Sequence, residues 1–512
     1  MAIQARSLTS RHLEVRDLLL ISDLHLGSHL KARTRGEYVH LAARLDESLP
    51  QFLDHYAQIG ARQGKWQLVV NGDFIDFWNV EIGDGTQDPI ELAVERLHAV
   101  LDEYPGVEDA LVSFLEAGNS IVFVAGNHDA EFLYPEVGRA LAERLEGALD
   151  DSEDADRLRE QITATGVATL DEVGAGRVRF VPWFVREGGA WIEHGHLFDP
   201  ACSTHAQLSP TRGGQLVKSV AEVATRRFTN LMPEIDYDAA DRFSTMDYVR
   251  WAMARGWRFM IRVLFLYLRM VGGMLGLWVR SGRVDKDGRA RHEERLAKLA
   301  KNAGLQMSAL TALEQMAPPP SSASVGGVLS VTALDLALSA VIPTFAIPLL
   351  FYALGWSLMI GAPLGLALGV MAAIQVKRRR SPRNVARDML EVASSVGEVT
   401  GTRIVLMGHS HRGSVERRGH VIYGNSGSWL DGSHLVVRRD GKPCEDGGER
   451  LAEVELRRWR NGGTTVLQTM HVDAADQAAS QDDVDELVQD QAQDQARDRA
   501  AFESLADASA AQ

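Results

Sequence analysis

A buried strand that ends in acidic side chains is predicted by Leu68-Val69-Val70-Asn71-Gly72-Asp73-Phe74-Ile75-Asp76-Phe77-Trp78. The Asn-Gly-Asp sequence after the apolar run is typical of a turn, so the strand would deliver Asp73 to a loop. Taken alone, the stretch is better explained by an ordinary turn. The rest of the chain decides between a turn and a ligand site.

The same arrangement, an apolar run followed by Asp, Asn or His, occurs four more times. These stretches are Ile21-Ser22-Asp23-Leu24-His25, Val124-Ala125-Gly126-Asn127-His128-Asp129, Trp191-Ile192-Glu193-His194-Gly195-His196 and Ile404-Val405-Leu406-Met407-Gly408-His409-Ser410-His411. In an α/β sheet such strand ends can lie side by side along one edge, where sites are commonly built. Repeated oxygen and imidazole groups of this kind indicate a metal site.

Short apolar strands alternate with amphipathic helices from Asp17 to about Asp199, which predicts an α/β layered domain. The expected strands cover residues 18–21, 67–70, 121–124, 178–184 and 190–192, and the expected helices cover 38–56, 90–104 and 107–117. Later strands near 420–423, 434–437, 452–456 and 464–467 would complete a second sheet of a sandwich.

An insertion separates the last of the five stretches from the others. The predicted organisation is a first α/β part at 1–205, a helical insertion at 206–387, a second α/β part at 388–472 and an acidic disordered tail at 473–512. The tail carries 11 acidic residues and two arginines, so most of the net charge of -15 lies there. The negative net charge argues against nucleic acid as the main partner, although the rest of the chain carries only -6 of it.

The insertion contains a long apolar segment from Val328 to Val376. A single helix of this length would be about 73 Å long at ~1.5 Å per residue, against a bilayer core of ~30 Å. Two spans, about 330–352 and 358–376, are therefore predicted as a transmembrane hairpin, and a buried pair of helices is the other interpretation. Asp335 would be either a functional group within the first span or a residue near the membrane interface.

Two crossings would leave both α/β parts on one side of the membrane. Lys377-Arg378-Arg379-Arg380 follows the second span, with Arg383 and Arg387 close behind, and such positive flanks mark the cytoplasmic side. Only two cysteines are present, and the first 16 residues contain no apolar stretch of signal-peptide length. The catalytic part is expected to face the cytoplasm.

A second helix in the insertion has a mixed character. Residues Arg258 to Val279 combine bulky apolar side chains with several arginines. This pattern is typical of a helix that lies on a membrane surface, and also of an amphipathic helix that packs on a core. Both interpretations stay open from the sequence.

The order and spacing of the five stretches closely resemble the calcineurin-like metallophosphoesterase family, over about 17–199 and 402–435. The resemblance implies a four-layered α/β/β/α sandwich and two divalent metal ions, with Mn, Fe and Zn all compatible with the ligands. In this comparison Asp23, His25 and His411 would hold one ion, Asn127, His194 and His409 would hold the other, and Asp73 would bridge them.

Two further residues have roles implied by the resemblance. His128 corresponds to a histidine that stabilises the phosphoryl group or protonates the leaving oxygen, and Asp76 corresponds to the acid that orients it. His196 would either replace His194 as a ligand or contact the substrate. The implied reaction is hydrolysis of a phosphodiester or pyrophosphate by a hydroxide between the two ions.

Local details resemble one branch of the family, which contains UDP-2,3-diacylglucosamine hydrolase. They are Ser22 to Gly27, Trp78 and the stretch Tyr423 to Trp429. The departures are the long insertion and His128, where well-known members of that branch have Arg. A lipid-linked substrate is therefore expected, with a soluble phosphodiester, a phosphoprotein or a non-catalytic scaffold as alternatives.

Overall fold

The protein is described by a computed structural model that covers residues 17–30, 36–61, 65–83, 87–166, 177–187, 189–232, 245–281, 284–379, 384–443 and 449–473. The predicted acidic tail from residue 474 onward, Cys444, Arg380 and Arg383 lie outside these ranges. The described chain has an α/β fold with mixed sheets.

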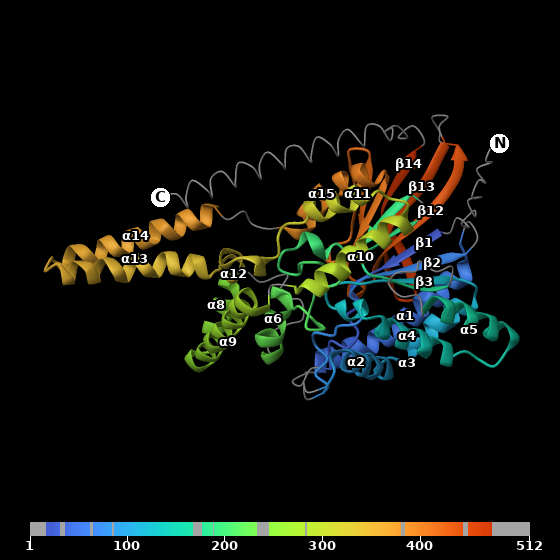
Figure 1. The fold of residues 1–512 in the computed structure, drawn as a ribbon, viewed down its shortest axis with the longest axis horizontal. Coiled ribbons are helices and arrows are strands. Elements are labelled where there is room, and N and C mark those ends of the chain that lie inside the picture. Colours follow the sequence, from blue (N-terminus) through green and yellow to red (C-terminus); the bar gives the residue numbers. More distant parts are fainter. Residues whose placement is uncertain are drawn as a thin grey trace.

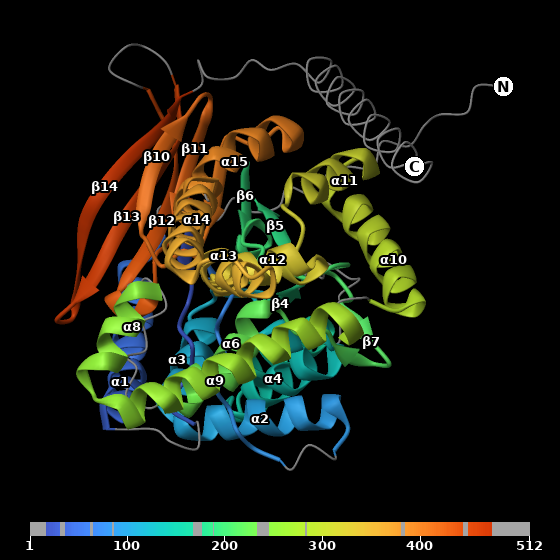
Figure 2. The ribbon, with the colours of Figure 1, turned by 90° about the vertical axis from the view of Figure 1, so that its left-hand side faces the viewer.

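Two large sheets form the body of the molecule (Figure 1, Figure 2). The first has the order β14-β13-β12-β1-β2-β3-β4, in which β1 to β4 are parallel and β12 to β14 are antiparallel. Its strands are β1 (Asp17–Ile21), β2 (Trp66–Asn71), β3 (Ser120–Val124), β4 (Val178–Val181), β12 (Ser433–Pro443), β13 (Glu449–Arg460) and β14 (Gly463–Asp473).

The second sheet has the order β10-β11-β9-β6-β5, and its inner strands β11, β9 and β6 are parallel. Its strands are β5 (Phe184–Glu187), β6 (Ala190–Glu193), β9 (Ile404–Met407), β10 (Ser414–Arg418) and β11 (Val421–Asn425). A separate two-stranded ribbon consists of β7 (Thr211–Arg212) and β8 (Gln215–Leu216).

Two predictions about the strands were wrong. The run 178–184 is not one strand, because it divides at Pro182 and Trp183 into β4 of the first sheet and β5 of the second. The last three strands do not complete the second sheet, because β12 pairs with β1 and carries β13 and β14 into the first. Apolar alternation identifies a strand but not its partner, which explains both errors.

Buried side chains alternate along the strands and form separate clusters. On β1, Leu18 and Leu20 belong to a cluster shared by both sheets, whereas Leu19 and Ile21 pack against helices on the opposite face. On β9, Leu406 joins the shared cluster and Met407 packs against another group of helices. This period of two fixes which side chains end at the sheet edge.

The helices on the outer face of the first sheet come from the first half of the chain. They are α1 (Gly36–Ile59), α2 (Pro89–Glu103), α3 (Pro105–Glu116), α4 (Pro135–Gly147) and α5 (Glu153–Gly166). The second sheet packs against α10 (Lys286–Ala303), α11 (Met307–Met316) and α15 (Val385–Thr400). The remaining helices are α6 (Val220–Arg227), α8 (Thr245–Ala254), α9 (Trp257–Gly276), α12 (Val325–Thr332), α13 (Leu334–Ala353) and α14 (Leu358–Arg379).

Helices α13 and α14 form a hairpin that projects away from the body (Figure 1). The predicted first span began too early, because α12 is a separate helix that ends at Ala333, where φ is 58°. Glycines on α14 allow close contact with α13: a Cβ on Gly365 would lie 2.8 Å from the Pro343 carbonyl oxygen. Small residues at such positions are typical of helices that pack within a membrane.

Three helices in the described part of the chain are long and apolar enough to cross a membrane. They are Trp257–Val279, Leu334–Ala353 and Leu358–Arg378. The second and third correspond to the predicted hairpin. The first includes α9, for which the sequence left two interpretations, a helix on a membrane surface and a helix packed on the core.

Candidate metal centre

The five polar stretches meet because they follow neighbouring parallel strands. β1, β2 and β3 are adjacent in the first sheet, and β6 and β9 are adjacent in the second. All the predicted ligands therefore come from loops at the carboxyl ends of these strands. Backbone hydrogen bonds join the loops, including His25 N to Asp73 O at 2.9 Å and Gly408 N to His194 O at 3.0 Å.

The backbone of these loops is unusual. Eight non-glycine residues in the described part of the chain have positive φ, and five of them are predicted metal ligands. These five are Asp23 (55°), His25 (50°), Asp73 (55°), His409 (61°) and His411 (54°). Each such conformation costs about 1–3 kcal/mol and tends to occur at functional sites. The positive φ angles therefore point to five of the residues that the sequence pattern predicted, and they do so independently of that pattern.

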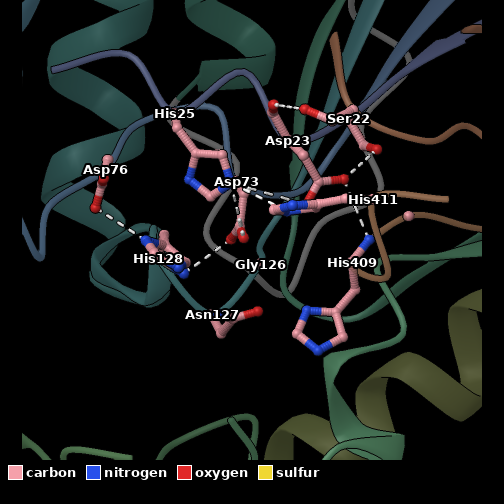
Figure 3. A network of polar contacts seen from close by, with 12 residues as sticks. Ser22, Asp23, His25, Asp73, Asp76, Gly126, Asn127, His128, His409 and His411 are labelled. Atoms are coloured by element: carbon pink, nitrogen blue, oxygen red, sulfur yellow. Dashed lines mark hydrogen bonds and ion pairs between the residues drawn. The ribbon is translucent and has the colours of Figure 1, made fainter. Parts of the chain in front are cut away.

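Four groups of described side chains have ligand atoms close enough to hold a metal ion, and one of them consists of His25, Asp73 and His128. Asp23, His25 and His411 form another, here called the first ligand group (Figure 3). His411 Nε2 lies 3.1 Å from Asp23 Oδ1 and 3.4 Å from His25 Nε2. Asp23 and His25 are buried, whereas His411 is partly exposed. The group is thus open to solvent on the His411 side only.

Asp73, His194 and His409 form the second ligand group. His194 Nε2 lies 3.3 Å from Asp73 Oδ2 and 3.2 Å from Asn127 Oδ1, so the predicted amide ligand is also present. Asp73 Oδ2 is 3.9 Å from His25 Nε2 in the first group. Asp73 consequently lies between the two groups.

Close packing of loops requires glycine at two positions. A Cβ on Gly126 would lie 2.2 Å from Asp73 Oδ1, and a Cβ on Gly72 would lie 2.3 Å from the His194 ring. Asp129 ties the loops together, because it accepts hydrogen bonds from the backbone N–H groups of Phe74 (2.7 Å) and Gly126 (2.6 Å). These contacts hold Asp73 in place.

Charges in the centre reinforce one another. Burial raises the pKa of Asp73, but His194 and His128 outweigh burial and hold this pKa well below its usual range. Burial lowers the pKa of His194, whereas Asp73 raises it, to about 9. At neutral pH the carboxylate is therefore ionised and the imidazole protonated. A divalent cation would take the place of that proton.

His128 lies at the opening of the centre and is held by Asp76. His128 Nδ1 is 2.9 Å from Asp76 Oδ1, and the His128 ring stacks on Trp78 with centroids 3.7 Å apart. Ser28 Oγ donates to Asp76 Oδ2 at 2.7 Å, and the Asn79 amide also donates to that oxygen. Burial lowers the pKa of His128, but Asp76 outweighs this effect and raises it.

Asp199 is a polar residue of the centre that sequence reasoning missed. Its Oδ2 lies 3.3 Å from His409 Nε2, and its Oδ1 accepts from Ala201 N at 2.9 Å. Asp199, Cys202 and His409 are also close enough to hold a metal ion. No sequence signal pointed to Asp199, because its partner His409 is 210 residues away along the chain.

His196, the predicted alternative ligand, is placed differently from His194. Its ring lies 5.4 Å from that of His194, and it belongs to none of the metal-compatible groups found among the described residues. It lines a neighbouring cavity of about 320 Å³ together with Trp78, Arg96 and Arg226. Burial and the neighbouring His194 hold the pKa of His196 well below its usual value.

A cavity of about 240 Å³ opens onto the centre. Its lining includes His128, Trp78 and five of the predicted ligands, which are His25, Asp73, Asn127, His409 and His411. The insertion contributes to the same lining through Ala221 and Thr225 of α6 and through Thr229 and Asn230 after it. The insertion therefore covers the centre.

The residues fit a divalent cation. Asp23 Oδ1 is buried and has no hydrogen-bond partner in the described part of the chain, although two imidazole nitrogens face it at 3.1 and 4.0 Å. A cation bound there would give Asp23 Oδ1 a partner. Carboxylate, amide and imidazole ligands together suit Mn²⁺, Fe²⁺ or Zn²⁺.

Comparison with known proteins identifies this region. Residues 17–227 match the calcineurin-like phosphoesterase family, so this part of the chain is a calcineurin-like phosphoesterase domain, and members of that family are metal-dependent hydrolases. The match includes the first four polar stretches and continues through α6, whereas His409 and His411 lie beyond it. No curated protein matches the chain.

Proposed function

We propose that the protein is a membrane-anchored phosphoesterase that uses two divalent metal ions to hydrolyse a phosphodiester or pyrophosphate bond. The observation that carries this proposal is the position of Asp73, which belongs to the metal-compatible group of His194 and His409 and also lies 3.9 Å from His25 of the other group. Asp73 Oδ2 faces His194 and His25, whereas Oδ1 accepts a hydrogen bond from the His128 backbone N–H, and this carboxylate would help to hold both cations. All seven expected ligands are present, which favours an enzyme over a non-catalytic scaffold.

Two divalent ions, when bound, would polarise the phosphoryl group and make a water molecule acidic enough to attack near neutral pH. His128 would bind the phosphoryl group or donate a proton to the leaving oxygen. Asp76 supports this role, because it fixes the ring through Nδ1 and leaves Nε2 to face the substrate. Asp76 raises the pKa of His128, which favours the protonated imidazole that this role needs.

The α13–α14 hairpin would anchor the enzyme. α13 is 20 residues long and has no buried residue, and α14 has 22 residues, so each is about 30 Å or more in length at ~1.5 Å per residue. Tyr352 and Trp356 are exposed at the far end, and Lys377 and Arg378 lie at the end next to the body. Aromatic residues at one interface and basic residues at the other suit a span with the body in the cytoplasm.

The four-layered α/β/β/α arrangement is part of the same proposal. It is supported by the cluster shared between the sheets and by the helical clusters on their outer faces. The proposed division at 1–205, 206–387 and 388–472 makes the insertion a separate module. Its helix α6 nevertheless contributes to the wall of the metal centre.

A lipid-linked substrate, such as UDP-diacylglucosamine, suits an enzyme held at the bilayer surface. The test is hydrolysis by the detergent-solubilised protein of UDP-diacylglucosamine, other lipid pyrophosphates, soluble nucleotides and a phosphopeptide, each with added Mn²⁺. Preference for an amphiphilic substrate supports the proposal. Equal or better turnover of the soluble compounds would instead favour a tethered phosphodiesterase or phosphoprotein phosphatase.

A further inference from the structure

Helix α9 has an exposed apolar face that no other described element covers. Trp257, Ile261, Leu264 and Leu268 repeat at helical spacing and are each more than half exposed. Phe265 extends this stripe and is 65% exposed. An uncovered face of this size marks an interaction site rather than an ordinary surface.

The opposite face of α9 is firmly attached to the protein. Met270, Val271 and Met274 are buried in a cluster with Val220 and Val223 of α6. Hydrogen bonds reinforce the attachment, from Tyr267 Oη to the Thr332 carbonyl at 2.8 Å and from Arg262 to the Leu231 carbonyl at 2.7 Å. In contrast, α13 has no buried residue.

The direction of α9 differs from that of the hairpin. In Figure 1 the hairpin leaves the body along its long axis and α9 lies at its base, on the hairpin side of α6. In Figure 2, which looks along the hairpin, α9 runs across the view. A bilayer crossed by α13 and α14 would therefore have α9 lying along its surface.

The charges on α9 suit this position. Arg258, Arg262 and Arg269 share one flank of the apolar stripe by their helical spacing, and Arg258 and Arg269 are exposed. Lys377 lies at the end of the hairpin next to the body, where α9 also lies. Basic side chains beside an apolar stripe are typical of helices that lie at the boundary between headgroups and acyl chains of anionic membranes.

We propose that α9 is an in-plane membrane helix whose stripe, defined by Trp257, Ile261, Leu264, Phe265 and Leu268, inserts into the surface of an anionic phospholipid bilayer without crossing it. This rests on the proposed anchoring of the hairpin. It also preserves an even number of crossings, although α9 is long and apolar enough to span.

The position of α9 connects the membrane to the metal centre. Helix α6 packs on α9 through Val220 and Val223, and its Ala221 and Thr225 line the cavity above the centre. One helix thus separates the bilayer surface from the candidate active site. For a substrate whose phosphate lies at that surface, α6 is the one of these two helices that lies between the phosphate and the metal centre.

The test is a depth measurement on the full chain in liposomes of phosphatidylcholine and phosphatidylglycerol. Nitroxide labels are placed by single cysteine substitutions, and the signal of the native chain, which carries Cys202 and Cys444, is subtracted. The positions on α9 are Trp257→Cys, Leu264→Cys, Leu268→Cys and Val279→Cys. Phe345→Cys in α13 is the deep reference, and exposed Glu143→Cys in α4 is the water reference.

An in-plane helix predicts the same shallow depth, about 5–10 Å, at all four α9 positions. A crossing helix predicts depths that change by ~1.5 Å per residue, about 33 Å from position 257 to position 279. That gradient would overturn the proposal. It would also be overturned if the α9 labels were accessible to an aqueous nickel chelate, or if a protein partner shielded them from both nickel and oxygen. A water-exposed label at Phe345→Cys with shallow α9 labels would support α9 but contradict the proposed hairpin anchor.

Discussion

The imidazole of His128 is fixed by the carboxylate of Asp76, with Nδ1 and Oδ1 2.9 Å apart. The same histidine uses its backbone N–H to donate to Asp73 Oδ1 at 2.8 Å. A residue proposed for proton transfer and the residue proposed to bridge the metals are thereby held in one rigid unit. Changes at these positions should separate metal binding from turnover.

His128→Ala should retain the metals but slow turnover about 10²- to 10³-fold, because it removes a proton donor and no ligand. Asp76→Asn should cause a smaller loss and move the alkaline limb of the pH profile to lower pH, because Asp76 raises the pKa of His128 and the imidazole must be protonated to donate. Metal content and kcat measured on both variants check this. Loss of metal from His128→Ala would show that His128 is a ligand.

Asp199→Asn should weaken metal binding about 10- to 100-fold, since a carboxylate that orients a ligating imidazole strengthens its binding. The amide keeps the size of the side chain but loses the charge that faces His409. Titration of the metal-free protein with Mn²⁺ measures the effect. Asp109→Asn, on an exposed position of α3, is the control. Equal affinities in the two variants would remove Asp199 from the centre.

Gly365→Leu should separate or destabilise the hairpin, because the added side chain would meet the backbone of Pro343 and the ring of Pro348. Overpacking of this kind costs about 1–3 kcal/mol. Ala367→Leu adds similar bulk on an exposed position of the same helix and should be tolerated. Thermal unfolding in detergent compares the variants. Equal midpoints would show that the glycine contact is not needed.

His434 should make the fold sensitive to acid. Burial lowers the pKa of His434 to about 3, whereas an unfolded histidine has a pKa near 6.5. Between these values only the unfolded chain binds the proton, so stability falls as pH falls, by about 2 kcal/mol between pH 7 and pH 5. His434→Gln should reduce this slope while keeping partners for Tyr56 and Gly432. If the melting temperatures of the two proteins fall equally between pH 7 and pH 5, the prediction is contradicted.

Much of the candidate site was predictable because each ligand follows its own strand at once. Asp73 and His194 are distant in sequence, but the parallel order of neighbouring strands brings their ends to one edge. The seven proposed ligands therefore appear together in the structure, although their roles remain proposals. Asp199 was missed because it lies in a loop after a short 3₁₀ helix, away from any strand end.

The sheet partners of the last strands were not predictable. β12 has the same alternating pattern whether it joins the first sheet or the second, and its pairing with β1 depends on the packing of Val436 and Val437 on opposite faces. The orientation of α9 was also undetermined by its sequence. Its composition fits a surface helix and a span, and the proposal of an in-plane helix rests on its contacts with α6, its charges and its direction relative to the hairpin.

The central claim is that Asp73 joins two metal ions in a hydrolytic centre, and metal analysis of the detergent-solubilised protein tests it most directly. The native chain should bind about two divalent ions and hydrolyse bis-p-nitrophenyl phosphate only when metal is present. Asp73→Ala should lose both the metals and the hydrolysis. A full metal complement in Asp73→Ala, or no metal-dependent hydrolysis by the native chain, would contradict the claim.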